Sequence, residues 1–275
     1  MGGKMERSTQ GAAHSFVWPL LLFLLFIGSC LPTPLLARET ALRVAFDEWP
    51  PWKMTTGQTM AGIDAAILER IGAQTSLQFE FVVAPWKRCI ELLKDGEVDL
   101  ITSFADNEER RAFADYVQPH YYLDAVRFYG LKGAGLVLER YEDLYGYRIG
   151  VVRGAHYDHR FDQDGKLEKE VVAHERQLKE MLFAGRIDLI IDWEVPFDYQ
   201  AREMGSSALL KKYGFDLTAG DDDSGGRPLQ HAYFMAFSKK SKKIHHKKEF
   251  ASALHSMVSR GEIERIVQEV VAQQP

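Results

Sequence analysis

The chain has 275 residues, a formal net charge of −5 and an apolar content of 46%. That length suits one large or two small domains, and the mild acidity argues against a nucleic-acid partner. The one long apolar run, residues 16–29, is too short to be a convincing membrane span, and no second run follows it.

The N-terminal 37 residues have the layout of a secretory signal peptide. Lys4 and Arg7 give a positive start, residues 16–29 (FVWPLLLFLLFIGS) form the apolar core, and Ala37 is a small residue that suits cleavage. A second cleavage position also fits, because FIGSC resembles a lipobox, in which Cys30 carries the lipid. The sequence therefore predicts an exported protein, and both the soluble and the lipid-anchored form stay open.

Strand and helix patterns alternate through the next part of the chain. Residues 42–52 (LRVAFDEWPPW) indicate a short strand broken by two prolines. Ile63, Ile67 and Ile71 recur at the helical spacing and predict a helix over residues 62–74. A strand, a helix and a buried strand are then predicted at residues 77–83, 85–96 and 98–104. This alternation is typical of an α/β domain with a largely parallel sheet.

One pattern occurs twice. LLKDGEVDLITSF (residues 92–104) and MLFAGRIDLIIDW (residues 181–193) align without a gap, and Ser103 and Asp192 occupy matching positions at the ends of the two strands. Open α/β sheets bind ligands at that edge. We therefore expect two lobes of similar construction whose facing edges form a cleft.

Two β-rich runs, residues 121–132 and 231–240, have the position of paired crossovers between the lobes. They would return the C-terminal helices to the first lobe. The predicted division is a leader at residues 1–37, a discontinuous first lobe at residues 41–124 plus 233–275, and a second lobe at residues 125–232.

A series of short motifs supports a more specific hypothesis. In chain order they are WPPW (49–52), GID (62–64), GEVDLITSF (96–104), NEERRAFADYVQPHYY (107–122), RIGVVRGAH (148–156), GRIDLIIDW (185–193), YFMAFSKK (233–240) and RGEIERIVQE (260–269). Together they resemble the extracellular solute-binding proteins of family 3, the polar amino-acid-binding subunits of ABC importers. The resemblance covers about residues 41–270. It implies the type II periplasmic-binding-protein fold, with two similar α/β lobes joined by a two-strand hinge.

The resemblance also implies site residues, of which an arginine that binds the ligand's α-carboxylate is the first. Arg110 in NEER is its equivalent, fixed by the spacing to Tyr116 and Pro119, and Asn107 replaces the family's threonine. A guanidinium can donate two parallel hydrogen bonds to a carboxylate. The alternative is a solvated charge at the start of a helix, which is the role we expect for Arg111, paired with a nearby acid.

Three more positions match the family's cleft in the first lobe. Trp49 matches the aromatic residue that packs over the ligand side chain, and its indole face would suit a flat or cationic group. Trp86 matches a cleft-lining apolar position, and Ser103 matches a serine that contacts the ligand. Core packing is the alternative for both tryptophans, and it is the role we expect for Trp52.

The second lobe departs from the family pattern. The family's ammonium-binding acid stands five residues after the aspartate that Asp188 matches, and here that position is Trp193, with Asp192 one residue earlier. One step along a strand reverses the face of the side chain. Either Asp192 reaches the cleft because the strand end bends, or the ammonium site is absent. His156 replaces a threonine of the family, and Arg153 is a candidate second positive contact.

These observations predict a non-enzymatic, periplasmic, monomeric protein that captures an amino acid or related small carboxylate and delivers it to an ABC permease. Two alternatives stay open: an enzyme similar to the cyclohexadienyl dehydratases, with Glu194 or His156 as acid or base, and a ligand-sensing module for a membrane receptor. No metal and no cofactor is expected, because His156 and His159 have no third ligand nearby in the sequence.

Overall fold

The computed structural model describes residue 2 and residues 41–57, 59–213 and 230–272. Apart from residue 2, the predicted leader, including Cys30, lies outside these residues. The described residues from 41 onward belong to one compact unit. Across the described ranges, no helix has both the length and the apolar character needed to cross a membrane.

The first lobe contains the parallel strands that the sequence predicted. β1 pairs with β4 on one side and with β5 on the other. α4 begins after Pro85 and ends at Gly96, whose φ of 78° is in the left-handed region that favours glycine. The elements of this lobe are β1 (Leu42–Phe46), β2 (Met54–Thr56), β3 (Thr59–Ala61), α3 (Ile63–Thr75), β4 (Phe79–Val83), α4 (Trp86–Asp95), β5 (Leu100–Phe104), α5 (Glu108–Arg111), β6 (Ala114–Tyr116), η4 (Ile244–His246), α9 (Lys247–Ser259) and α10 (Glu262–Ala272).

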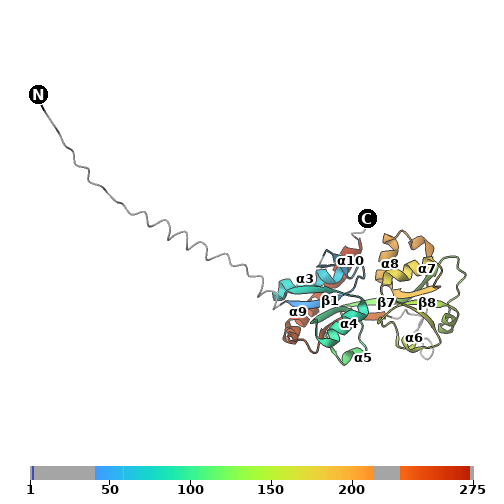
Figure 1. Cartoon of the computed structure of the whole chain (residues 1–275), viewed down its shortest axis with the longest axis horizontal. Coiled ribbons are helices and arrows are strands. Elements are labelled where there is room, and N and C mark those ends of the chain that lie inside the picture. Colours follow the sequence, from blue (N-terminus) through green and yellow to red (C-terminus); the bar gives the residue numbers. More distant parts are fainter. Residues whose placement is uncertain (1, 3–40, 58, 214–229, 273–275) are drawn as a thin grey trace. The chain divides into compact units, whose positions relative to one another are not determined.

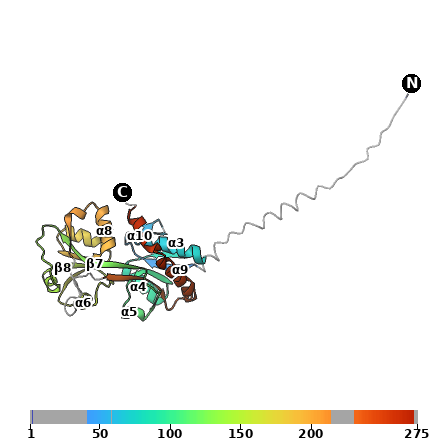
Figure 2. The ribbon, with the colours of Figure 1, turned by 180° about the vertical axis from the view of Figure 1, so that it is seen from behind.

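Both faces of this sheet are covered by helices, because its strands are apolar on both sides. On β1, Val44 and Phe46 pack with Phe250 and Leu254 of α9, whereas Ala45 packs on the other face with Cys89 and its neighbours on α4. The C-terminal helices therefore complete the core that the N-terminal strands begin, and α3, α9 and α10 lie together in both ribbon views (Figures 1 and 2).

The second lobe repeats the plan, with β8 between β9 and β10 and all three strands parallel. α6, α7 and α8 lie at this end of the molecule (Figure 1). The elements are η2 (Tyr141–Gly146), β8 (Arg148–Val152), α6 (His159–Gln163), β9 (Glu168–Val172), α7 (Glu175–Phe183), β10 (Leu189–Trp193), α8 (Glu194–Glu203), η3 (Ser207–Leu209) and β11 (Leu210–Tyr213).

Two long strands join the lobes, β7 (Tyr122–Leu131) and β12 (Gln230–Ser238). They are antiparallel to each other, with Tyr122 opposite Tyr233 and Asp124 opposite His231. β12 continues beside β5 and β7 continues beside β10, so one mixed sheet has the order β4-β1-β5-β12-β7-β10-β8-β9. The expected pair of crossover strands is therefore present, and bending at this pair would move one lobe relative to the other.

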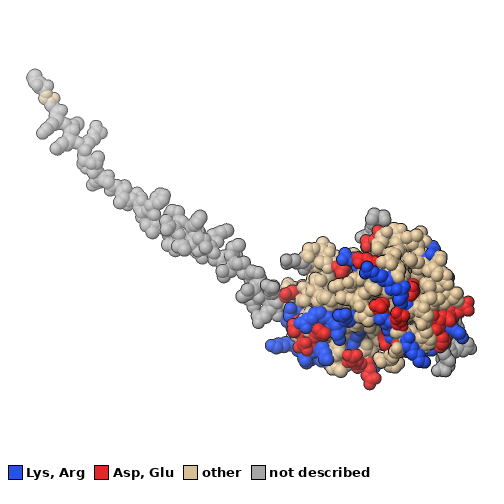
Figure 3. Space-filling view, turned by 45° about the vertical axis from the view of Figure 1, so that its right-hand side comes forward, with Lys and Arg blue, Asp and Glu red and all other residues tan. Residues whose placement is uncertain are grey.

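Charges of both signs are mixed on the face shown in Figure 3. The lysine-rich stretch at residues 239–248 includes two ion pairs with acids of the first lobe, Lys243 with Asp99 and Lys247 with Asp115. The stretch is thus partly neutralised by its own lobe.

Candidate ligand-binding site

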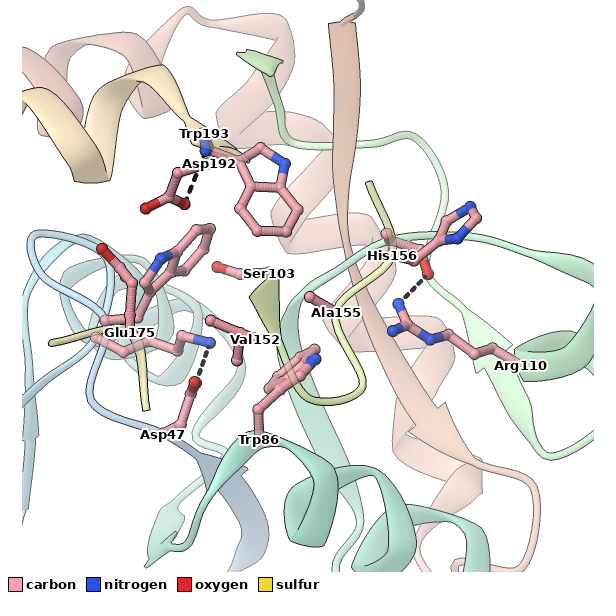
Figure 4. Close-up of a pocket in the computed structure, with 13 residues that line it drawn as sticks. Asp47, Trp86, Ser103, Arg110, Val152, Ala155, His156, Glu175, Asp192 and Trp193 are labelled. Carbon is pink, nitrogen blue, oxygen red and sulfur yellow. Dashed lines mark hydrogen bonds and ion pairs between the residues drawn. The ribbon is translucent and has the colours of Figure 1, made fainter. Parts of the chain in front are cut away.

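A pocket with a cavity volume of about 40 Å³ lies where the ends of the strands of the two lobes face each other. Figure 4 shows its residues, which come from both lobes: Asp47, Trp49, Lys53, Trp86, Ser103, Ala105, Arg110, Val152, Ala155, His156, Glu175, Asp192 and Trp193. Six of the eight predicted site residues are in this set: Trp49, Trp86, Ser103, Arg110, His156 and Asp192.

Of the two arginines that the sequence predicted for the site, Arg110 is the more deeply buried. It lies on the four-residue helix α5, where the side chain of Asn107 accepts a hydrogen bond from its backbone nitrogen. The side chain is only 5% exposed, and its guanidinium lies 4.4 Å from the Phe104 ring centroid. Burial lowers the pKa of Arg110 to about 10, so the group is still charged at neutral pH and its charge is poorly solvated.

The guanidinium of Arg110 donates to two backbone carbonyls. Nη1 donates to Ala105 O at 2.9 Å, and Nη2 donates across the cleft to Gly154 O at 2.8 Å. Trp86 Nε1 donates to the same Gly154 oxygen at 3.2 Å. The two lobes are therefore in direct contact at the mouth of the pocket. A carboxylate would be a stronger acceptor for Arg110 than either carbonyl.

Asn107 and Arg153 do not line this pocket. They lie in an adjoining groove together with Lys87 and Lys169, and Arg110 and His156 border both spaces. The place of Asn107 in the structure is that of a helix cap. Arg111, by contrast, is 64% exposed and pairs with Asp106 through two hydrogen bonds, as expected of a surface charge next to an acid.

Lys53 and Asp47 are pocket residues that the sequence reasoning did not select. Lys53 Nζ lies 2.7 Å from Asp47 Oδ1, 5.0 Å from the Trp49 ring centroid and 4.6 Å from the Trp86 ring centroid. The sequence feature that could have identified Lys53 is its position four residues after Trp49. The backbone groups of these two residues pair as in a hairpin, which puts their side chains on one side.

Ser103 is at the end of β5, and its polar groups are used within the protein. Its Oγ donates to Asp64 Oδ2 at 2.6 Å, while Tyr121 Oη donates to Asp64 Oδ1 at 2.7 Å. Its φ of 50° is in the left-handed region, which is strained for a residue with a Cβ atom. Burial raises the pKa of Asp64, which Lys53 and these hydrogen bonds oppose. Ser103 can therefore accept a hydrogen bond from a ligand, but its proton is committed to Asp64.

Both residues that competed at the end of β10 line the pocket, from opposite faces of the strand. Trp193 packs on the face that carries Ile191, where its ring stacks on Tyr157 at 5.0 Å and meets Trp49 edge-on at 5.3 Å. Asp192 points to the other face, toward α7. Because the pocket lies beyond the end of the strand, it is reached from either face.

Asp192 forms a pair with Glu175 at the start of α7. The two side chains are 2% and 6% exposed, and apart from the contact between the two acids, Asp192 Oδ2 and Glu175 Oε2 have no hydrogen-bond partner among the described residues. Lys179 neutralises Glu175 at 2.7 Å. Burial, the charge of Glu175 and a hydrogen bond between the two acids raise the pKa of Asp192 well above its ordinary value. The pocket therefore has an acidic wall on the second lobe.

The structure also shows the surroundings of the histidine pair for which no metal was expected and of the catalytic acid considered as an alternative. His156 pairs with Asp162, and its ring lies 5.9 Å from that of His231. No group of three or more potential metal ligands occurs within the described part of the chain. Glu194 is outside the pocket lining, held by Arg127 at 2.9 Å and Lys212 at 2.8 Å. Burial raises the pKa of Glu194, but these hydrogen bonds outweigh burial, so the net shift is downward.

Comparison with solved structures identifies the fold of this protein. An arginine-binding protein mutant from T. maritima has a TM-score of 0.71 at 16% identity, covering 86% of this chain and 97% of that one. The substrate-binding protein of an amino acid ABC transporter has a TM-score of 0.69 at 16% identity, covering 85% and 99%. These likenesses show the fold, which is the type II fold of periplasmic binding proteins, and the predicted fold class is confirmed.

The family model for bacterial extracellular solute-binding proteins, family 3, matches residues 42–272. The chain belongs to this family, as the motifs indicated. A curated relative, a probable histidine-binding protein of Campylobacter jejuni, is 28% identical over 107 residues. That match covers 38% of this chain and 41% of the relative, so the chain aligns with less than half of that protein's length.

Proposed function

We propose that this protein binds an amino acid or a related small carboxylate between its two lobes in the periplasm and presents it to an ABC importer. The single observation that carries this is a buried guanidinium, Arg110, in a pocket to which both lobes contribute. The family assignment and the named relatives, which are binding proteins for amino acids, support the same conclusion.

The proposed movement is hinge closure. Residues 41–124 with 233–275 form one rigid lobe in this proposal, and residues 125–232 form the other. Opening would break the contacts of Gly154 O with Arg110 and Trp86 and the hydrogen bond from Gln200 Nε2 to Pro50 O. A ligand carboxylate would then replace a carbonyl as an acceptor for Arg110, and reclosure over it would remove it from water.

We further propose that the protein is a monomer that binds without catalysis. Support comes from the commitment of the polar groups around the pocket: Ser103 to Asp64, His156 to Asp162 and Glu194 to two cations outside the lining. Incubation with prephenate or arogenate, with detection of an aromatic product, tests this part. Turnover that is lost in His156→Ala would favour the dehydratase alternative.

A thermal-shift screen of the purified protein tests the binding function. It would include the common amino acids, their amides and esters, and small organic acids. We expect a concentration-dependent rise in melting temperature with at least one carboxylate-bearing compound and no rise with its methyl ester, since the ester lacks the anion that Arg110 would bind. A panel without any carboxylate hit, or an ester that works as well as its acid, would contradict the proposal.

A further inference from the structure

Lys53 holds its ammonium group close to two of the three tryptophans that line the pocket, Trp49 and Trp86. The residue follows Trp52 directly, and hydrogen bonds of 2.7 and 2.9 Å between the backbones of Trp49 and Lys53 fix the turn. Residues paired in this way across a hairpin direct their side chains to the same side. The lysine is therefore held beside Trp49 by the backbone.

The surroundings of the ammonium group are aromatic and nearly dry. Lys53 is 2% exposed, and its Nζ approaches the Trp49 and Trp86 ring centroids at 5.0 and 4.6 Å. Both distances are in the range of cation–π contacts. The Trp49 and Trp86 rings are thus already in contact with a cation of the chain itself.

The ammonium group also retains unused hydrogen-bonding capacity. An ammonium has three N–H donors, and Asp47 Oδ1 is the one acceptor of Lys53 among the described residues. Two donors therefore remain in a lysine that lines the pocket. A ligand oxygen would satisfy them, whereas a ligand ammonium or guanidinium would be repelled.

Lys53 and Arg110 make their contacts in different parts of the pocket. Arg110 meets the second lobe at Gly154, and Lys53 lies with Asp47 beneath the tryptophans of the first lobe. Figure 4 shows Asp47 on the opposite side of the view from Arg110, with Trp86 between them. A ligand with one carboxylate at Arg110 could therefore present a second polar group toward Lys53.

We propose that Lys53 sets the specificity of the pocket: it selects carboxylate ligands whose far end carries a hydrogen-bond acceptor, a second carboxylate or an amide oxygen, and it rejects cationic side chains. This inference rests on the proposed function, because it assumes that the pocket binds such a ligand. The proposed role of Lys53 does not depend on Arg110, since Lys53 would contact the opposite end of the ligand.

Isothermal titration with L-glutamate, L-glutamine and L-arginine tests the inference. We expect the unmodified protein to bind glutamate or glutamine at least 10-fold more tightly than arginine, since each 1.4 kcal/mol changes affinity tenfold. Lys53→Met removes the charge and keeps an unbranched side chain. We expect this variant to lose that preference and to gain affinity for arginine.

Two further variants keep the test decisive. The double variant Asp47→Asn/Lys53→Met removes both charges of the ion pair, so no unpaired Asp47 is left behind. It therefore provides the affinity measurement even if the single variant Lys53→Met does not fold. Lys94→Met removes an equal charge from an exposed position on α4 and should leave all three affinities unchanged.

Three results would overturn the inference. They are preference of the unmodified protein for arginine, an unchanged preference in both Lys53 variants, or binding of none of the three compounds. The outcome for the proposed function is distinct, because a different carboxylate found in the thermal-shift screen would preserve the binding function while removing this role of Lys53.

Discussion

The two copies of the repeated strand end differently although they align residue by residue. Ser103 at the end of β5 donates a hydrogen bond to Asp64 in the core and has a φ of 50°, in the left-handed region. Asp192, at the matching place on β10, shares a hydrogen bond with the buried acid Glu175 and has no other partner for its Oδ2 among the described residues. The first end is therefore completed by the protein itself. At the second end two buried acids face each other and only Glu175 has a cation beside it, Lys179, so we expect a ligand's hydrogen-bond donor to bind at Asp192.

The largest effect is expected at Arg110, which stands beyond the end of β5. Arg110→Ala should weaken binding of the carboxylate found in the screen on the order of 100-fold, because it removes a buried, charge-assisted partner. Arg110→Lys should restore only part of the affinity, since an ammonium lacks the two-pronged geometry. Isothermal titration measures both.

The neighbouring arginine provides the matched control. Arg111→Ala removes the same charge one residue away, from a side chain that is 64% exposed. We expect the Arg111→Ala variant to bind the carboxylate from the screen with the same affinity as the unmodified protein. Equal losses in the Arg110 and Arg111 variants would mean that net charge, and not a contact within the pocket, controls binding.

The next largest effect is expected at Asp192. Asp192→Asn keeps the shape but weakens the acceptor, so it should reduce affinity about 10-fold for a ligand with an ammonium group. The same ligand without its amine should bind the variant and the unmodified protein equally. An equal loss for both ligands would contradict a donor-binding role for Asp192 and favour general disturbance of the pocket.

Ser103→Ala should act mainly on stability. Asp64 would lose a donor while it stays buried, which costs about 1–3 kcal/mol of unfolding free energy. We expect the affinity to change much less than it does in Asp192→Asn. Urea unfolding and titration of the same variant separate the two effects, and a large loss of affinity without loss of stability would place Ser103 with the ligand.

A separate effect, on stability and not on affinity, is a pH dependence at the crossover strands. Burial raises the pKa of Asp124 to about 7, although hydrogen bonds from Tyr233, Val195 and Ala125 oppose this. The folded pKa lies above the unfolded value, so the stabilising contribution is complete below about pH 4 and is lost as the pH rises toward 7. Between about pH 5 and 8 the unfolding free energy should fall by about 2 kcal/mol from this group.

Asp124→Asn tests this effect, because an amide does not titrate and keeps a carbonyl oxygen for the Tyr233 hydroxyl. We expect its melting temperature to decline less than that of the unmodified protein over the same pH range. Parallel declines would mean that other groups control the pH dependence.

Much of the fold could be predicted because its signals are local. The isoleucine spacing in α3, Pro85 and Gly96 at the ends of α4, and the repeated strands β5 and β10 each specify an element from neighbouring residues. The two crossover strands followed from their position between the copies of the repeat.

The pocket was less predictable because its remaining residues meet only in three dimensions. Glu175 reaches Asp192 from a different element, 17 positions earlier in the chain. Lys53 reaches Trp86 because a turn directs it inward. The choice between Asp192 and Trp193 could not be made from strand alternation, because both side chains border a pocket that begins where the strand ends.

The most direct measurement is a crystal structure of the complex with the carboxylate that gives the largest thermal shift. We expect the carboxylate to lie between the lobes, with its two oxygens about 3 Å from the nitrogens of the Arg110 guanidinium. A ligand bound elsewhere, with Arg110 still bonded to the carbonyls of Ala105 and Gly154, would contradict this expectation.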